Sequence, residues 1–408
     1  MTHTGAKARW LSIVGIGEDG VAGLSPAACG LISAAELVFG GARHLKLVAP
    51  LIQGAARPWP SPFAKGIAEV VAARGRQVCV LASGDPFFYG VGSTLAQQID
   101  PAEMAVVPGA SAFSIAAARL GWALPETVLV SLHGRDLDRI RPHLHPCARI
   151  LALTSDGDGP QALATLLSET GFGQSRLTVL EALGGKDERI AASTAAAFNL
   201  DNVAALNTVA VEVIAGADAR VIAYTPGLAD DLFEHDGQIT KREVRAMTLA
   251  ALAPKRGERL WDLGAGSGSV AIEWMLADPS LKAVAVERDA ARAARIRRNA
   301  AAFGVPGLEV VEGTAPVALA ALAPPDAIFI GGGASVAGVL DAAIAALRPG
   351  GRLVVNAVTL ETESVLIAAH ATRGGELTRI AIAHSDCVGT KTGWRSAMPV
   401  TQWAWQKP

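Results

Sequence analysis

Short runs of valine, isoleucine and leucine alternate along the whole chain with longer alanine-rich stretches, and glycine or proline stands at most of the junctions. The short runs have the length of buried strands, and the alanine-rich stretches have the spacing of helices. The 43 glycines and 22 prolines fall between these segments and form no low-complexity blocks. This alternation predicts an α/β protein in which mostly parallel strands are layered against helices.

The same pattern predicts the individual elements of both halves. In the first half we expect strands near residues 10–14, 77–82, 104–107, 128–131, 150–154, 176–181 and 208–214, and helices near 65–74, 91–98, 112–120, 160–169 and 194–198. Ser25 and Pro26 predict a further helix start, as N-cap and first-turn proline. In the second half we expect strands near 259–263, 282–287, 308–312, 326–330, 352–357, 377–384 and 398–405, and helices near 269–277, 289–303, 336–347 and 361–371. The second half is therefore predicted to be an open, doubly wound sheet.

The regular pattern lapses around residues 216–237, where turn-forming and acidic residues are concentrated. We therefore expect one domain over residues 1–217, a linker over 218–235 and a second domain over 236–408. Thr240 and Glu243 have the spacing of a capping box, which predicts that the second domain opens with a helix.

Charge and cysteine content argue against several classes of protein. The formal net charge is −2, from 36 basic and 38 acidic side chains, so we expect no nucleic-acid partner. No uninterrupted apolar run is long enough to cross a bilayer, and the apolar stretch at 11–16 is too short for a signal peptide. The four cysteines lie far apart, without a histidine at zinc spacing. We therefore expect no membrane partner, no bound metal and a cytoplasmic location.

The second half carries Asp-Leu-Gly-Ala-Gly-Ser-Gly-Ser at residues 262–269, at a predicted strand-to-helix turn. Alternate glycines let the backbone approach a ligand closely, and the helix start presents free N–H groups. The spacing matches neither a dinucleotide fingerprint nor a P-loop. Glu287 ends the next predicted strand and suits the two ribose hydroxyls of a nucleoside, while Asp262 suits a cationic amino-acid end. The combination favours S-adenosylmethionine.

Three glycine-containing segments follow predicted strands in the first half. Residues 15–20 match Gly-x-Gly-x-x-Gly, but we expect no dinucleotide there, because the helix opens only after Ser25 and no acid ends a second strand. Ser-Gly-Asp-Pro-Phe-Phe-Tyr-Gly at 83–90 and Val-Pro-Gly-Ala-Ser-Ala at 107–112 also follow strand ends, where α/β sheets place ligands.

Together these first-half segments resemble the tetrapyrrole methyltransferase family, and in particular its branch that methylates carbon 5 of a precorrin in the cobalamin pathway. The resemblance covers residues 10–215 and rests on the segments at 15–20 and 83–90 and on Phe-Gly-Gly-Ala-Arg-His-Leu at 39–45. It implies a two-lobed α/β fold with an S-adenosylmethionine cleft.

Residues 236–362 resemble the Rossmann-like methyltransferases that methylate carbon 15 of a precorrin and decarboxylate it. The resemblance rests on residues 236–245, the 262–268 loop, the strand ending at Glu287 and Val-Asn-Ala-Val-Thr-Leu-Glu-Thr at 355–362. Halves fused in this order resemble cobalamin-pathway enzymes that act on both carbons. The resemblance thus implies a precorrin substrate and two S-adenosylmethionine sites per chain.

The resemblance also implies particular contacts with the cofactor. In the first domain these are Ser83, Gly84, Asp85, Gly90, Ser111, Ala112, His133 and Gly134. In the second domain they are Thr240, Gly264, Gly266, Gly268, Glu287, Gly313, Thr314 and Ala315, to which the argument above adds Asp262.

Substrate contacts are predicted from the chemistry of the implied precorrin. Its many carboxylates are natural partners for arginine, and the arginines beside the motifs are Arg43, Arg135, Arg242 and Arg245. Residues 329–335 follow the fourth strand of the second domain, where such methyltransferases face their substrate, and Asn356 ends the next strand. Gly332, Ser335 and Asn356 are the candidate catalytic residues. We also expect a homo-oligomer.

Three other functions are compatible with parts of this pattern. The second domain could methylate another small molecule or an RNA while the first domain regulates it. A nicotinamide dehydrogenase is a second alternative, supported only by the glycines at residues 15–20. A non-catalytic nucleoside-binding scaffold is a third, and it would not convert S-adenosylmethionine to product.

Overall fold

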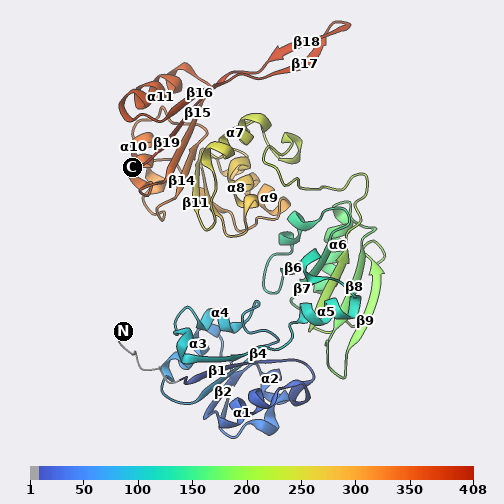
Figure 1. The fold of residues 1–408 in the computed structure, drawn as a ribbon. Coiled ribbons are helices and arrows are strands. Elements are labelled where there is room, and N and C mark those ends of the chain that lie inside the picture. Colours follow the sequence, from blue (N-terminus) through green and yellow to red (C-terminus); the bar gives the residue numbers. More distant parts are fainter. Residues whose placement is uncertain (1–8) are drawn as a thin grey trace. The chain divides into compact units, whose positions relative to one another are not determined.

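The computed structural model describes residues 9–408 and divides into two compact units. The first unit contains the described residues up to 135 together with 143–220, and the second contains 136–142 and 221–408. Both units combine helices with β-sheets, so the predicted α/β class is confirmed (Figure 1). None of the helices in residues 9–408 is long and apolar enough to cross a membrane.

The first sheet of the first unit has the strand order β3-β2-β4-β1-β5, and all of its pairings are parallel. Its strands are β1 (Leu11–Ile16), β2 (Leu37–Gly40), β3 (Ala55–Pro58), β4 (Val78–Ser83) and β5 (Met104–Val107). The accompanying helices are α1 (Pro26–Ala34), α2 (Ala42–Leu47), α3 (Phe63–Ala72) and α4 (Val91–Leu95). Ser25 caps α1 by accepting a hydrogen bond from the Ala28 amide, as predicted.

The second sheet of this unit is mostly antiparallel, with the order β6-β7-β10-β8-β9. Its elements are β6 (Thr127–Ser131), β7 (Arg149–Leu153), β8 (Arg176–Glu181), β9 (Arg189–Thr194), β10 (Asn207–Glu212), α5 (Ala112–Leu120) and α6 (Gly159–Glu169). The helix predicted near 194–198 is wrong, because β9 pairs with β8 up to Thr194 and a turn follows.

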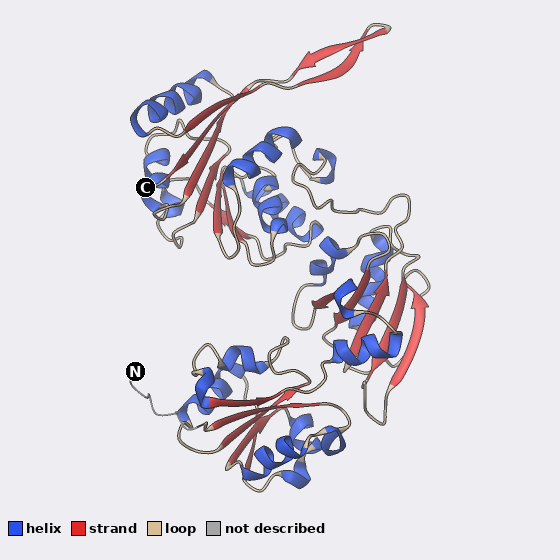
Figure 2. Ribbon diagram, viewed as in Figure 1, coloured by secondary structure: helices blue, strands red, loops and turns tan. Residues whose placement is uncertain are grey.

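The second unit contains a seven-stranded sheet of order β13-β12-β11-β14-β15-β19-β16 with helices on both faces (Figure 2). Its strands are β11 (Arg259–Leu263), β12 (Lys282–Glu287), β13 (Glu309–Glu312), β14 (Ala327–Ile330), β15 (Arg352–Ala357), β16 (Glu376–Ile380) and β19 (Val400–Gln406). Its helices are α7 (Arg242–Leu252), α8 (Ser269–Ala277), α9 (Ala290–Ala302), α10 (Val339–Ala346) and α11 (Leu360–Arg373). The strands β11 to β15 are parallel, and separate apolar clusters cover the two faces, which confirms the doubly wound prediction.

Several short elements complete the chain. The hairpin β17 (Ala383–Val388) and β18 (Lys391–Ser396) was not predicted; it projects beyond the sheet and leaves Trp394 80% exposed (Figure 1). Short 3-10 helices occur at Gly20–Gly23, Ala49–Leu51, Pro101–Glu103, Leu124–Glu126, Leu137–His143, Asp230–Leu232 and Val317–Leu319.

The predicted linker at 218–235 is largely packed into the second unit. Ile222, Leu228 and Phe233 are each 4% exposed and belong to the apolar core of that unit. The Leu228 amide also donates to the buried carboxylate of Glu273 at 3.0 Å. A turn-rich composition therefore did not indicate a free connection, because three spaced apolar side chains attach the otherwise largely exposed segment to the core of the second unit.

The predicted capping box is wrong. Helix α7 begins at Arg242, with Lys241 as N-cap and no side-chain capping hydrogen bond. The carbonyl of Thr240 instead accepts a hydrogen bond from Arg245 at 2.6 Å. The buried guanidinium thus fixes the chain just before the helix through a carbonyl, while the first N–H groups of α7 receive no side-chain cap.

Candidate functional site

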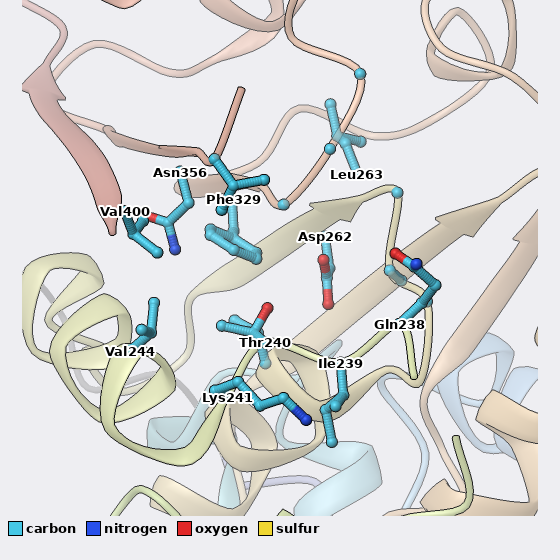
Figure 3. A pocket seen from close by; sticks show the side chains of 18 of the residues that line it. Gln238, Ile239, Thr240, Lys241, Val244, Asp262, Leu263, Phe329, Asn356 and Val400 are labelled. Carbon is cyan, nitrogen blue, oxygen red and sulfur yellow. The ribbon is translucent and has the colours of Figure 1, made fainter. Parts of the chain in front are cut away.

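A pocket of about 880 Å³ opens in the second unit at the carboxyl ends of β11, β12, β14 and β15 (Figure 3). Its wall combines the glycine loop after β11 with residues 237–244 at the start of α7. Parallel sheets place ligands at this edge, and the volume lies in the range of small-molecule sites. Among residues 9–408 no group of three histidine, cysteine or acidic side chains could hold a metal ion.

The glycine loop after β11 depends on backbone conformations that other residues rarely adopt. Gly264, Gly266 and Gly268 have φ of +71°, +58° and +76°. A Cβ on Gly266 would lie 3.0 Å from the carbonyl oxygen of Gln238, and Gly268 serves as the N-cap of α8. Gly264 and Gly266 line the pocket, so the loop brings bare backbone to the cavity.

Asp262, at the carboxyl end of β11, carries a buried carboxylate that is only half satisfied. Its Oδ2 accepts a hydrogen bond from the Ala271 amide at 3.2 Å, whereas Oδ1 is buried and has no partner among the described residues. Burial, together with the charge of Glu287, raises the pKa of Asp262 to about 7. An unpartnered carboxylate oxygen on the wall of a pocket is suited to the ammonium group of an amino acid.

We expect the affinity of the second unit for S-adenosylhomocysteine to depend on pH through Asp262. The ionised carboxylate, which attracts a cation, is populated above the pKa of about 7. Affinity should therefore rise with pH through neutrality and weaken by up to about tenfold per pH unit below it. Calorimetry from pH 5.5 to 8.5 measures the profile. Asp262→Asn should bind weakly with a flat profile, and an unchanged slope in that variant would contradict the assignment.

Glu287 ends β12 and is 4% exposed, with its carboxylate on the pocket wall. Its Oε2 accepts from the Gly266 amide at 2.9 Å, and its Oε1 accepts from the Asp289 amide at 3.1 Å. Each oxygen retains a lone pair that can accept a ribose hydroxyl. Glu287 therefore shapes the glycine loop in addition to its predicted ribose contact.

Replacing Glu287 by alanine should raise the KM for S-adenosylmethionine in the second unit roughly 10- to 100-fold, because charged hydrogen bonds worth about 1.5–3 kcal/mol are lost. The chemical rate at saturation should change little, since the ribose lies away from the transferred methyl group. Steady-state kinetics separate the two effects. Glu312→Ala is the matched control, because Glu312 pairs in register with Glu287 on β13 but does not line the pocket. A collapse of turnover at saturating cofactor would contradict this role.

The structure brings most of the other predicted second-domain residues to the same cavity. Lining residues include Thr240, Gly313, Thr314, Ala315, Gly332 and Asn356. Gly268 and Ser335 are not among the lining residues; Gly268 is the N-cap of α8, and Ser335 lies on the surface. The pocket therefore does not support the predicted cofactor contact of Gly268 or the predicted catalytic role of Ser335.

The two predicted arginine anchors on α7 differ sharply. Arg242 is exposed on the pocket wall and is free to meet a substrate carboxylate. Arg245 is fully buried and donates to Glu273 at 2.6 Å and to Asp230 at 3.1 Å. This geometry contradicts the prediction that Arg245 binds substrate, because its guanidinium is buried and already donates to acceptors within the protein. Arg245 holds the segment before α7 in place.

In the first unit, the loops after β1, β4 and β5 converge. The Gly84 amide donates to the Ile16 carbonyl at 3.0 Å, and the Gly109 amide donates to the Gly84 carbonyl at 3.1 Å. A Cβ on Gly15 would lie 1.9 Å from the Gly84 oxygen, so only glycine permits this approach. The predicted loops at 83–90 and 107–112 thus meet at the carboxyl edge of the first sheet.

A polar cluster lies beside this convergence. Arg43 contacts Ser83 Oγ at 3.3 Å and His44 Nε2 at 2.8 Å, and it forms an ion pair with Glu18. His44 Nε2 lies 2.9 Å from Ser83 Oγ, and burial followed by the charge of Arg43 lowers the pKa of His44 to about 4. His44 is neutral at physiological pH, so Arg43 supplies the positive charge next to Ser83.

The other predicted first-domain residues have local structural partners. Asp85 accepts from the Phe87 amide at 2.8 Å, Gly90 is the N-cap of α4, and Ser111 caps α5, which begins at Ala112. His133 Nδ1 lies 3.2 Å from the Thr154 carbonyl, and the Gly134 amide donates to Ser155 at 2.9 Å. These last contacts lie at the ends of β6 and β7 in the second sheet.

Three aromatic side chains in the 83–90 loop are partly exposed to solvent. Phe87, Phe88 and Tyr89 are 48%, 38% and 47% exposed, and Tyr89 has a φ of +55°. The guanidinium of Arg135 lies 5.5 Å from the Tyr89 ring centre. A strained tyrosine that presents its ring beside an arginine is a feature of binding loops rather than of cores. The sequence signal was three adjacent aromatics between glycines.

The fold and the pocket of the second unit define an α/β methyltransferase class: a glycine loop after the first strand, an acid at the end of the next strand and a cavity at that sheet edge. Residues 231–407 match the precorrin methyltransferase domain, and residues 11–199 match the tetrapyrrole (corrin/porphyrin) methylases.

Relatives match the chain over almost its whole length. It is 61% identical over 398 residues to a precorrin-6Y C(5,15)-methyltransferase (decarboxylating) of a Sinorhizobium species, covering 98% of this chain and 96% of that protein. A Mycobacterium tuberculosis protein of the same name is 42% identical over 397 residues, with 96% and 98% covered. A Salmonella typhimurium cobalt-precorrin-6B C(15)-methyltransferase (decarboxylating) is 35% identical over 40% of this chain and 81% of its own. The chain belongs to the family of precorrin-6Y C(5,15)-methyltransferases (decarboxylating).

Proposed function

We propose that this chain uses S-adenosylmethionine to methylate a precorrin at carbons 5 and 15 and to decarboxylate an acetate side chain, as a step of cobalamin biosynthesis. The observation that carries the proposal is the pocket of the second unit, where the unpartnered carboxylate oxygen of Asp262, Glu287 and the bare glycine loop lie together. Charge, hydrogen-bond acceptors and space in this pocket match a cationic amino acid joined to a nucleoside. The names of the full-length relatives support the substrate.

The proposal divides the chemistry between the two units. The first methylates carbon 5, with its cofactor at the converging loops 83–90 and 107–112; the second methylates carbon 15 and decarboxylates. Two cofactor sites per chain follow. The match of separate families to residues 11–199 and 231–407 supports this division. Assembly into a homo-oligomer and a cytoplasmic location complete the proposal.

The protein's contribution is binding and alignment rather than acid–base chemistry. The cofactor supplies an activated methyl group, and an electron-rich carbon of the macrocycle receives it in an in-line displacement that depends on orientation and exclusion of water. Asp262 and Glu287 would hold the amino-acid and ribose ends in the second unit. Arg43, Arg135 and Arg242 are exposed or half-exposed and would anchor substrate carboxylates.

Two fragments test the division of labour, cut between residues 220 and 221 so that Ile222, Leu228 and Phe233, which pack in the core of the second unit, stay with it. Each is incubated with precorrin-6Y and isotopically labelled S-adenosylmethionine, and products are analysed by mass spectrometry. We expect the first fragment to add one methyl group and the second to add one methyl group with loss of carbon dioxide. Transfer to both carbons by one fragment, or no transfer by the intact chain, would contradict the proposal.

A further inference from the structure

Three buried polar side chains form a small network behind one wall of the pocket in the second unit. Asn356 on β15 and Gln402 on β19 are directly paired in the antiparallel register, and Thr248 reaches them from α7. Their residues are 9%, 4% and 0% exposed. Of the three, Asn356 lines the pocket, while Thr248 and Gln402 lie behind it.

The hydrogen bonds of this network leave one orientation for each amide. The Thr248 hydroxyl donates its single proton to the Val244 carbonyl at 2.8 Å, so its oxygen can only accept from the two amides. Asn356 Nδ2 donates to that oxygen at 2.9 Å and Gln402 Nε2 at 3.2 Å. Gln402 Nε2 also donates to Asn356 Oδ1 at 3.0 Å. Both amide nitrogens therefore face Thr248, and neither side chain can flip without losing a bond.

One donor of the network remains uncommitted. Asn356 Nδ2 carries two hydrogens, and within residues 9–408 Thr248 is its one acceptor. Figure 3 shows the Asn356 amide on the pocket wall among Val400, Phe329 and Val244. The second hydrogen is therefore available on a part of the pocket wall that Val244, Phe329 and Val400 otherwise make apolar. A buried polar group in such surroundings is costly unless a ligand pairs with it.

We propose that Thr248 and Gln402 are positioning residues that hold Asn356 so that its free N–H receives the acetate carboxylate that the substrate loses. This inference rests on the proposed function and deepens it. A neutral amide fixes the carboxylate in place, and the neighbouring Val244, Phe329 and Val400 strip it of water. An arginine at this position would stabilise the carboxylate by its charge and so oppose its loss.

The chemistry needs no further reactant from the protein. The bond between the acetate methylene and the carboxylate breaks, and carbon dioxide leaves. The released electron pair moves into the adjoining conjugated imine of the macrocycle, whose nitrogen takes up a proton from water. An apolar wall favours this step, because negative charge becomes delocalised as the localised carboxylate disappears.

Thr248→Val tests the inference in the full-length chain, because valine has a similar shape but no hydroxyl acceptor. We expect kcat/KM for carbon dioxide release from precorrin-6Y to fall about five- to tenfold, whereas Thr248→Ser, which keeps the hydroxyl, should be near wild type. Binding of S-adenosylhomocysteine and methylation at carbon 5 should be unchanged in both variants. Gln402→Met is a second variant. It removes the hydrogen bond from Gln402 to Asn356 Oδ1 and should also slow carbon dioxide release.

A double-mutant cycle separates positioning from a merely structural role. If Thr248 acts through Asn356, Thr248→Val should cost nothing further in an Asn356→Ala background. The same fold-loss in both backgrounds, or wild-type decarboxylation by both Thr248→Val and Gln402→Met, would overturn the inference while leaving the proposed function intact. Absence of carbon dioxide release from the wild-type chain would instead overturn the proposed function, and the inference with it.

Discussion

Replacing Gly266 by arginine should abolish cofactor binding in the second unit while leaving the first unit active. The backbone there has a φ of +58°, which costs a side-chain-bearing residue about 1–2 kcal/mol. The new side chain would also meet the Gln238 carbonyl, 3.0 Å from its Cβ, and extend into the pocket. We expect decarboxylation and methylation at carbon 15 to disappear and methylation at carbon 5 to persist, as measured by product mass.

Gly257→Arg is the matched control for this substitution. Gly257 has a similarly positive φ of +83°, but a Cβ at that position meets nothing within 4 Å, and Gly257 does not line the pocket. The control should therefore carry comparable backbone strain with both activities intact. Loss of carbon 15 chemistry in the control, or its survival in Gly266→Arg, would show that the glycine loop does not bind the cofactor.

Arg245→Met should destabilise the second unit by about 3–5 kcal/mol, because it leaves the buried carboxylate of Glu273 without its cation and leaves the half-buried Asp230 with Lys241 alone. The guanidinium also donates to the Thr240 and Leu228 carbonyls and lies 4.8 Å from the Phe233 ring centre. Chemical denaturation followed by tryptophan fluorescence measures the loss, since Trp261 and Trp274 are buried in this unit.

Arg298→Met provides the comparison for Arg245. Arg298 forms an ion pair with Glu234 at 2.7 Å, but both side chains are more than half exposed, so its loss should cost less than about 1 kcal/mol. If Arg245→Met unfolds like wild type and instead raises the KM for the tetrapyrrole, Arg245 is a substrate anchor after all and the structural role is wrong.

Local patterns were sufficient to predict most of the second unit. Strands β11, β12, β14 and β15 contain buried apolar runs, and a glycine or an acid stands at the end of the first three, so these signals act within a few residues of sequence. The placement of Asp262 and Glu287 on one cavity followed from the same rule, because parallel strands end at a common edge. The hairpin β17–β18 was missed because its strands are largely exposed and mix polar with apolar residues.

The first unit was harder to predict where strands lack a strong apolar pattern. Strand β3, with all four residues exposed, and the edge strand β9 owe their existence to pairing with the preceding strand of their sheet rather than to an apolar pattern of their own. Pairing of this kind overrides local propensity. The alanine-rich residues 194–198 therefore predicted a helix, although β9 ends at Thr194 and a turn follows.

Side-chain partners distant in sequence account for the remaining misses in the site. Arg245 lies next to a predicted motif, and arginine is the residue type that binds carboxylates. Its guanidinium is nevertheless buried and donates to Glu273 on α8. Thr248 and Gln402 carry no motif, and only the register of β15 with β19 brings Gln402 to Asn356. Spacing along the chain contains no information about such contacts.

The most direct test of the account is the number of cofactor molecules bound per intact chain. Titration calorimetry of the full-length protein with S-adenosylhomocysteine, at a pH above 7 so that Asp262 is ionised, measures that number. The two unlike glycine-loop sites, at residues 83–112 and 262–287, predict saturation at two equivalents. Saturation at one equivalent by a fully folded chain would contradict the assignment of a separate methyl transfer to each unit.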